Sequence, residues 1–141
     1  MYNFIMPTNN VTRFLDSRNI KYTAHELPAE KIGAVEAAQI LNVPESQVFK
    51  TIVTTREKGK PVLAVIPGDR SVDLKSLASF LNEKKMSLPT QNEAEKLTDL
   101  QAGGISPLAL INKGFQVVLD STCESYEEIF ISGGQRGINI Q

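Results

Sequence analysis

Helical periodicity marks several segments of the chain. Apolar positions recur every three or four residues within 11–15, 34–41 and 74–81, and each run predicts a helix with one buried face. Pro44 ends the second of these helices, because proline lacks the amide hydrogen needed to continue it. Thr90 and Glu93 have the spacing of a capping box, which predicts one more short helix through Leu97.

Runs of β-branched and apolar residues between these helices predict strands. Segments 48–55 and 61–66 flank the turn Glu57–Lys60 and predict a β-hairpin. Both faces of 48–55 are mostly apolar, so we expect this strand to be central in its sheet. Shorter strands are expected at 21–27, 115–119, 129–132 and 137–140, and irregular structure at 102–107.

The order of these elements indicates the fold class. The sequence has neither strict β-α-β alternation nor an all-strand rhythm, and it contains no internal repeat or long linker. We therefore predict an α+β fold with a mixed, largely antiparallel sheet flanked by helices. A length of 141 residues predicts a single compact domain over 1–141, with residues 1–8 as a frayed tail.

Composition narrows the classes of function. Fifteen basic and 16 acidic residues give a net charge of −1, which argues against binding of long nucleic acid by bulk charge but permits a weaker RNA contact. One cysteine (Cys123) and one histidine (His25) exclude a disulfide framework and a multi-thiolate or two-histidine metal site. We expect no metal and no cofactor. Apolar runs too short for a bilayer and the lack of a signal peptide predict a cytoplasmic protein without a membrane or DNA partner.

Lys50 is the most informative polar residue. It lies in the apolar strand expected at 48–55, where burial of an unpaired ammonium group is unfavourable. The nearest acids, Glu45 and Glu57, lie outside that strand. A ligand phosphate or carbonyl is one partner that would satisfy Lys50. Alternatively, its side chain reaches solvent at the end of the sheet or pairs with a distant carboxylate.

Two glycine-rich stretches are the other candidate binding features. Paired glycines permit a positive φ and let a ligand approach main-chain N–H groups, which can hold an anion. Neither stretch has the pattern of a Walker loop or a dinucleotide fingerprint, and two tight turns would have the same sequence. The stretches are Gly103-Gly104-Ile105-Ser106-Pro107 and Ser132-Gly133-Gly134-Gln135-Arg136-Gly137.

These motifs together resemble one family. The sequence is similar to the YbaK/EbsC family of aminoacyl-tRNA deacylases, whose fold is also that of the editing domain inserted in bacterial prolyl-tRNA synthetases. The Ser-Gly-Gly-x-Arg-Gly core near the C-terminus favours the YbaK branch over the ProX-like branch. The resemblance covers about residues 10–140 and rests on Val48–Ile52, Val72–Lys75, Gly103–Leu108 and Ile129–Gly137.

The resemblance implies a pocket for the 3′-terminal adenosine of tRNA carrying an amino-acid ester. It implies that Lys50 is the catalytic residue, close to the ester and the terminal phosphate. The family pattern also implies a set of substrate-binding positions, namely Thr51, Gly103, Gly104, Ile105, Ser106, Ser132, Gly133, Gly134 and Asn139, with Leu27 and Ile32 in the pocket wall.

Three departures from the family pattern bear on specificity. Asn139 stands where YbaK-like members often carry an acid, so a polar contact is kept while a charge is lost. Leu27 and Ile32 stand in place of aromatic residues that shape the pocket in YbaK. The chain ends at Gln141, without the C-terminal helix that some relatives have.

We therefore predict a trans-acting enzyme that cleaves the ester of mischarged aminoacyl-tRNA. No Ser–His–Asp, Cys–His or metal set is visible, so the protein would supply positioning and electrostatics, with N–H groups of Gly103 and Gly104 around the oxyanion. The nucleophile would be water or a group of the substrate. Cys-tRNA(Pro) is the expected best substrate and prolyl-tRNA synthetase the expected protein partner. The alternative is a non-catalytic binder of aminoacyl-tRNA 3′ ends or nucleotides.

Overall fold

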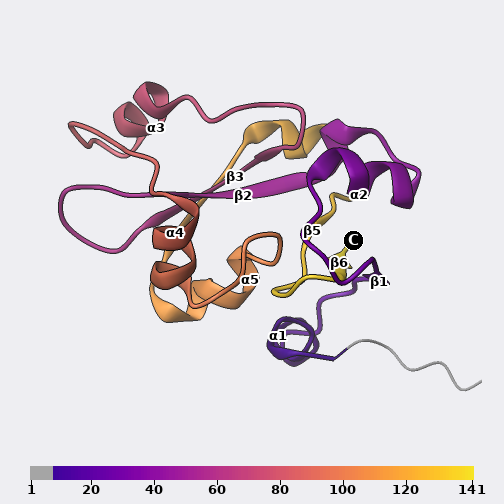
Figure 1. Ribbon diagram of the computed structural model, residues 1–141. Coiled ribbons are helices and arrows are strands. Elements are labelled where there is room, and N and C mark those ends of the chain that lie inside the picture. The colour runs from indigo at the N-terminus through magenta and orange to yellow at the C-terminus, as the bar shows by residue number, and fades with distance from the viewer. Residues whose placement is uncertain (1–7) are drawn as a thin grey trace, which may run out of the picture.

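Two three-stranded sheets form the framework of the computed structural model, which describes residues 8–141 (Figure 1). Of the tail predicted at residues 1–8, only Thr8 is among the described residues. One sheet is antiparallel with the order β1-β6-β5, formed by Ala24–Glu26, Ile138–Ile140 and Ile131–Ser132. The other has the order β2-β3-β4, formed by Phe49–Thr54, Val62–Pro67 and Gln116–Leu119. The α+β prediction is confirmed, with the strands divided between two sheets that meet at a bridge between Val48 and Phe130.

The hairpin predicted at 48–66 is present, but its first strand is at an edge. β2 pairs antiparallel with β3, and β4 adds to the other side of β3 in parallel. β3 is therefore the central strand, and every one of its residues is buried. The expectation of a central strand at 48–55 was wrong. Its two apolar faces reflect helices above and below the sheet rather than strands on both sides.

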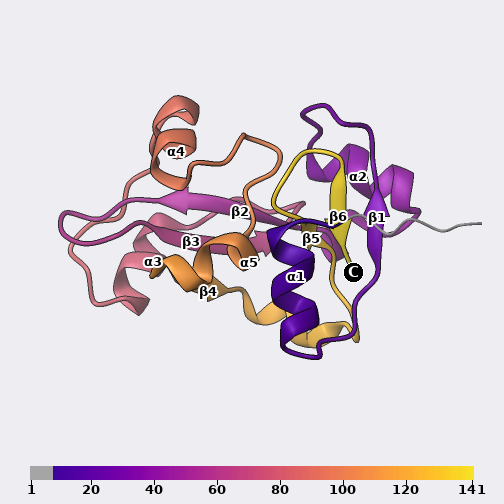
Figure 2. The same ribbon diagram turned by 90° about the horizontal axis from the view of Figure 1, so that it is seen from below.

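Helices cover the two faces of the hairpin. α3 (Leu74–Phe80) and α4 (Gln91–Thr98) lie on opposite sides of it (Figures 1 and 2). Because side chains alternate along a strand, Val62 and Ala64 pack in the cluster with α3, whereas Leu63 packs in the cluster that includes residues of α4 and α5. Both faces of β3 are therefore covered by helices.

Three further helices surround the second sheet. α1 (Asn10–Ser17) packs against β5 and β6, and α2 (Ala34–Leu41) packs against Val48 and Phe130. α5 (Pro107–Leu110) was not predicted, because the glycines before it favoured irregular structure. Short 3-10 helices occupy Glu45–Gln47, Ile111–Lys113 and Ser121–Ser125. No helix within residues 8–141 combines the length and the apolar character that a membrane crossing requires.

Helix starts follow the local sequence closely. Thr90 and Glu93 form the predicted cap of α4, with the Glu93 N–H donating to Thr90 Oγ1 at 3.2 Å. Asp73 caps α3 in the same way, and hydrogen bonds from the main chain and the hydroxyl of Ser76 lower the pKa of Asp73. Asn9 caps α1 and also donates to Gly133 O at 2.7 Å, which ties α1 to the C-terminal glycine stretch.

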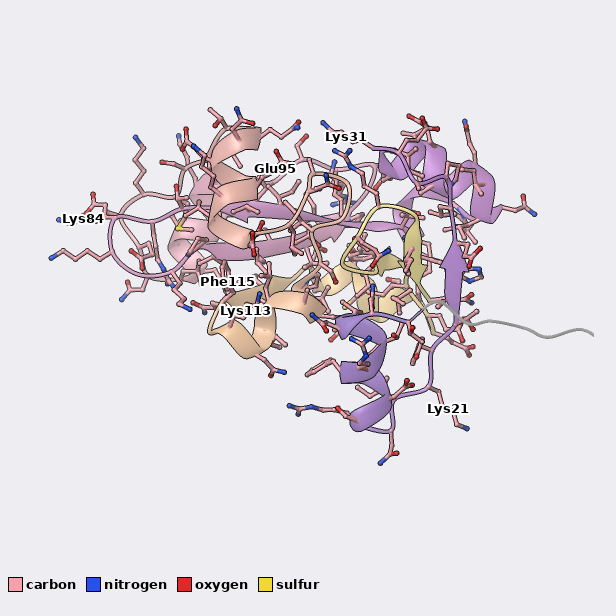
Figure 3. All side chains as sticks on the ribbon, turned by 60° about the horizontal axis from the view of Figure 1, so that its bottom comes forward. Lys21, Lys31, Lys84, Glu95, Lys113 and Phe115 are labelled. Carbon is pink, nitrogen blue, oxygen red and sulfur yellow. The ribbon has the colours of Figure 1, made fainter. Side chains whose placement is uncertain are left out.

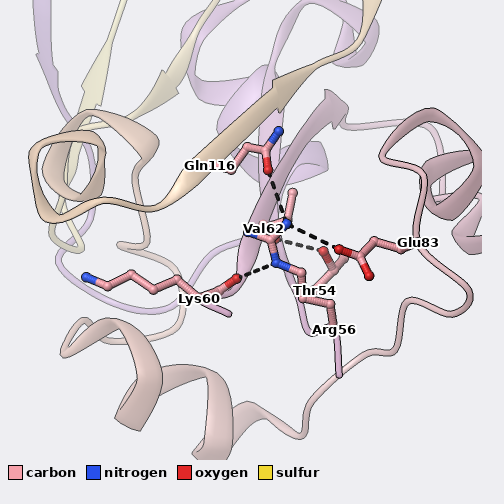
Figure 4. Close-up of polar contacts among 6 residues, drawn as sticks. All are labelled: Thr54, Arg56, Lys60, Val62, Glu83 and Gln116. Carbon is pink, nitrogen blue, oxygen red and sulfur yellow. Dashed lines mark hydrogen bonds and ion pairs between the residues drawn. The ribbon is translucent and has the colours of Figure 1, made fainter. Parts of the chain in front are cut away.

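Arg56 holds the turn end of the hairpin together. It donates to Lys60 O at 3.0 Å and to Gln116 Oε1 at 3.3 Å, and it lies 3.5 Å from Glu83 Oε1 (Figure 4). This is the one ion pair within the part of the chain that the structure describes. Its partners come from β4 and from the segment after α3, so Arg56 links three parts of the fold.

Candidate functional site

A cavity of about 280 Å³ lies where the two sheets meet. Its lining comes from the loop 27–33, β2, β5, β6, the first turn of α2 and the segment 102–105. The walls are mostly apolar, with Ala34, Ala37 and Ile138 among them. Polar groups enter this apolar space at a few points only, which is the usual composition of a small-molecule site.

The cavity brings together eight of the residues predicted from the sequence. They come from five separate segments of the chain, so only folding places them side by side. They are Leu27, Ile32, Lys50, Thr51, Gly103, Ile105, Ser132 and Asn139.

Four other residues predicted to bind substrate do not line the cavity. Ser106 is fully buried and caps α5, where its hydroxyl accepts from the Leu108 N–H. The N–H of Gly104 donates to Gln101 O at 2.8 Å, and that of Gly133 donates to Ile138 O at 2.9 Å. Gly134 packs against Val11 of α1. These residues lie in turns next to the cavity, and their part in substrate binding stays a prediction.

Lys50 has a backbone carbonyl as its partner. Its Nζ donates to Gly68 O at 3.2 Å, just beyond the end of β3, and the side chain is half-buried. Within residues 8–141 no carboxylate oxygen lies within 4.0 Å of it. Pairing with a distant carboxylate, one alternative left by the sequence, is therefore wrong. A single carbonyl leaves other ammonium protons free to bind a ligand oxygen.

Thr51 borders the same cavity from the other face of β2. Side chains at consecutive positions of a strand point to opposite faces, yet residues 48–51 all line the cavity. This is possible because the cavity meets β2 at the edge that is not paired with β3. The Oγ1 atom of Thr51 is buried and has no hydrogen-bond partner among residues 8–141.

Asn139 contributes a second buried oxygen without a partner. It lies in β6, the middle strand of its sheet, directly opposite Ser132 of β5. The residue is 6% exposed, and its Oδ1 is closed to solvent and makes no hydrogen bond within residues 8–141. A buried polar atom left unpaired costs about 1–3 kcal/mol, so Asn139 is a candidate to meet a ligand donor once its amide turns toward the cavity.

The segment 101–104 forms a strap over one side of the cavity. Ala102 is held on both sides: its N–H donates to Glu95 Oε2 of α4 at 2.8 Å, and its carbonyl accepts from Arg136 Nε at 2.7 Å. Gly103 has a φ of +89°, which a side chain would disfavour. The strap is thus a rigid part of the cavity wall.

Sequence reasoning missed several contributors to the site. Gly33 and Ala34, at the amino end of α2, line the cavity, and Gly33 provides no side-chain cap for the helix. A glycine just before an apolar helix was the available signal. Nothing in the sequence around Gly68 predicted a role in the site, because its carbonyl meets Lys50 only in the folded chain. Glu30 is exposed and is the one carboxylate among the described residues of the lining.

His25 is not part of the cavity lining. His25 Nε2 is 2.8 Å from Gln141 Oε1, and the imidazole ring packs near Phe130, so this side chain makes its contacts within the fold. Within residues 8–141 no three His, Cys, Asp or Glu side chains come together as a metal site would require.

Replacement of Gly104 by alanine should disturb the strap. The added Cβ would lie 2.7 Å from main-chain atoms of Gln135, which cannot move without shifting the loop that carries Arg136. We expect Gly104→Ala to lower the free energy of unfolding by about 1–3 kcal/mol in urea titrations. Gly33→Ala is the control, since nothing lies within 4 Å of its Cβ. Equal stability of the two variants would contradict the packing argument.

The sequence as a whole was then compared with known proteins. Residues 29–141 match the aminoacyl-tRNA editing domain family. The chain belongs to this family. EbsC of Enterococcus faecalis, which is named for deacylation of Cys-tRNA(Pro) and Cys-tRNA(Cys), is 32% identical over 94% of this chain and 81% of its own length. The resemblance found from the motifs is therefore confirmed.

Two further matches connect this family with prolyl-tRNA synthetases. A proline–tRNA ligase of Fervidobacterium nodosum is 25% identical over 73% of this chain, although the match covers 17% of the ligase. A crystal structure described as a candidate trans-editing enzyme for prolyl-tRNA synthetase superposes with a TM-score of 0.79 at 27% identity, covering 93% of this chain and 82% of that one. This editing domain thus resembles both a segment of a synthetase and a free-standing protein.

Proposed function

We propose that this protein removes the amino acid from mischarged tRNA(Pro), with the cysteinyl ester as its best substrate. Membership of the aminoacyl-tRNA editing family supports ester cleavage on aminoacyl-tRNA as the class of reaction. The observation that carries the proposal is an apolar cavity lined by Lys50, whose ammonium group has a single hydrogen-bond partner among the described residues, and by Thr51 and Asn139, each with a buried oxygen that has none. In the proposal, residues 1–141 act as one editing domain.

Lys50 would be the catalytic residue of this site. Its free N–H groups would donate to the ester carbonyl oxygen and stabilise the negative charge that develops there, or would bind the terminal phosphate. The Gly104 N–H already donates to Gln101 O, so it is not free to donate to the oxyanion. The uncapped amino end of α2, at Ala34, is a better placed source of main-chain donors.

The unpartnered oxygens would orient the substrate. Thr51 Oγ1 and Asn139 Oδ1 are closed to solvent, so each side chain would rotate before its oxygen accepts a hydrogen bond from a ribose hydroxyl or from the α-ammonium group of the amino acid. Leu27, Ile32 and Ile105 would contact the side chain of the amino acid. A wall of this kind discriminates by size, and one methylene changes the binding free energy by only about 1–3 kcal/mol. Several small amino acids should therefore enter.

Cysteine has a chemical advantage in such a site. Its sulfur can attack its own carbonyl carbon; the carbon–sulfur bond forms as the bond to the ribose oxygen breaks, and the thiol proton passes to that oxygen. The protein need only hold the two reacting ends together, a contribution that can be large. This proposal fits a cavity in which no Ser, Cys or His of the lining forms a nucleophile–base pair.

A panel of charged tRNAs tests the proposal. Loss of amino acid is measured on tRNA(Pro) carrying cysteine, alanine, serine or proline; we expect cysteine to be lost fastest, alanine and serine more slowly, and proline at the uncatalysed rate. Asn139 is uncharged where YbaK-like members often carry an acid. For this reason a non-catalytic binder is the second candidate. Tight binding without loss of any amino acid would favour the binder and contradict the deacylase.

Prolyl-tRNA synthetase is the proposed partner. A net charge of −1 gives the protein little general attraction for RNA, so the affinity for free tRNA should be modest and sensitive to salt. Delivery by the synthetase would overcome this. A nanomolar dissociation constant for tRNA alone at physiological salt would contradict the need for such delivery.

A further inference from the structure

Two basic side chains, Lys31 and Arg136, lie next to Gly103 of the strap and form with it what we call the rim of the cavity. Lys31 belongs to the loop before α2, and Arg136 belongs to the C-terminal glycine stretch. Both approach Gly103: a Cβ at that position would lie 3.4 Å from Lys31 Cγ and 3.6 Å from Arg136 Cγ. Gly103, which lines the cavity and has no side chain, thus has two cationic residues as neighbours.

Both cations are held in place by neutral partners. Arg136 Nε donates to Ala102 O at 2.7 Å, and Lys31 Nζ donates to Gln91 Oε1 of α4 at 2.6 Å. Within residues 8–141 neither forms an ion pair. Figure 3 shows Lys31 on the side of the molecule that carries α4, with its ammonium group directed outward. Neither cationic group therefore has a carboxylate oxygen of the described chain within 4.0 Å, so both keep their charge free of a direct ion pair.

We propose that Lys31 and Arg136 bind the phosphodiester groups that precede the terminal adenosine of the tRNA. This inference rests on the proposed function. If the ester lies beside Lys50, the single-stranded 3′ end has to leave the cavity across its rim, carrying one phosphate per nucleotide. Gly103 lets the nucleic-acid backbone approach the strap closely, and the two flanking cations are then within reach of its phosphates.

The chemistry of the rim favours phosphate over base recognition. Lysine and arginine pair with phosphate oxygens irrespective of sequence, so the rim would accept any tRNA 3′ end. Glu30 lines the cavity next to Lys31 in the chain and would oppose an incoming phosphate. The contribution of the rim should therefore be moderate, and it should weaken as salt rises.

Kinetics on two substrates test the proposal. Lys31→Gln is compared with wild type on cysteinyl-tRNA(Pro), which has phosphates, and on 3′-O-cysteinyl-adenosine, which has none. We expect a 3- to 10-fold loss of kcat/KM on the tRNA, carried by KM, and no change on the nucleoside ester. The slope of log kcat/KM against log salt on the tRNA should become shallower by about 0.7 for each phosphate contact removed.

Lys84→Gln is the matched control, because Lys84 is an exposed lysine far from Lys31 (Figure 3). Equal effects of the two variants on the tRNA, or an equal loss by Lys31→Gln on both substrates, would overturn the proposal. Arg136→Gln should lose activity on both substrates, because Arg136 also holds Ala102, and it should lose more on the tRNA. An equal loss by Arg136→Gln would likewise count against phosphate binding.

A binding measurement separates this inference from the proposed function. If wild type cleaves neither ester, the deacylase proposal fails while the rim can still be tested. Uncharged cytidyl-cytidyl-adenosine trinucleotide should then bind wild type and Lys84→Gln alike and bind Lys31→Gln at least threefold more weakly. Identical binding to all three proteins would overturn the phosphate rim by itself.

Discussion

Replacement of Lys50 by methionine should lower kcat/KM for cysteinyl-tRNA by about 10²–10³-fold. Methionine keeps the length of the side chain but removes every N–H donor, and loss of one donor to a developing oxyanion typically has an effect of this size. Folding should persist, since the ammonium group of Lys50 contacts only the Gly68 carbonyl among described residues. The rate is measured under single-turnover conditions, with unfolding followed in parallel.

The control for Lys50→Met is Lys84→Met, which removes an exposed lysine that is not part of the cavity lining. It should retain the wild-type rate. Deacylation by Lys50→Met within threefold of wild type on every substrate that wild type cleaves would show that Lys50 is not the catalytic residue. If activity and stability fall together, the role of Lys50 is structural, through its hydrogen bond to Gly68 O just beyond the end of β3.

Methylation of the substrate sulfur should have a comparably large effect. S-methylcysteinyl-tRNA(Pro) keeps the size class of the side chain but has no thiol to attack its ester. If the reaction uses that thiol, we expect its rate to fall by about 100-fold or more, because an internal nucleophile has an effective molarity far above that of any external group. The measurement is the release of labelled amino acid at matched enzyme concentration.

Binding has to be measured alongside this comparison. The methylated ester should still compete with cysteinyl-tRNA, since the cavity wall is apolar and accommodates an added methyl group at small cost. Equal cleavage of the two esters would exclude the thiol route and identify water as the nucleophile. In that case alanyl-tRNA, which also has no thiol, should be cleaved at a similar rate.

Local sequence determined where most helices and strands begin. The caps at Asp73 and Thr90 were predictable because each side chain bonds an N–H three residues further along the same chain. The helix at Ala34–Leu41 and the hairpin also followed from patterns that need only neighbouring residues. The motifs around Lys50 and the two glycine stretches were sufficient to identify the family, because they require order along the chain and not geometry.

Tertiary structure alone decided how those motifs are used. Alternation along β2 separates Lys50 from Thr51, and only the unpaired edge of that strand brings both to one cavity. Gly103 and Gly104 are adjacent in sequence, yet one lines the cavity and the other packs on Gln135. Whether a strand is central depends on which distant strand pairs with it. The burial of Asn139 and the approach of Lys31 and Arg136 to Gly103 likewise arise from contacts between remote segments, which no local pattern encodes.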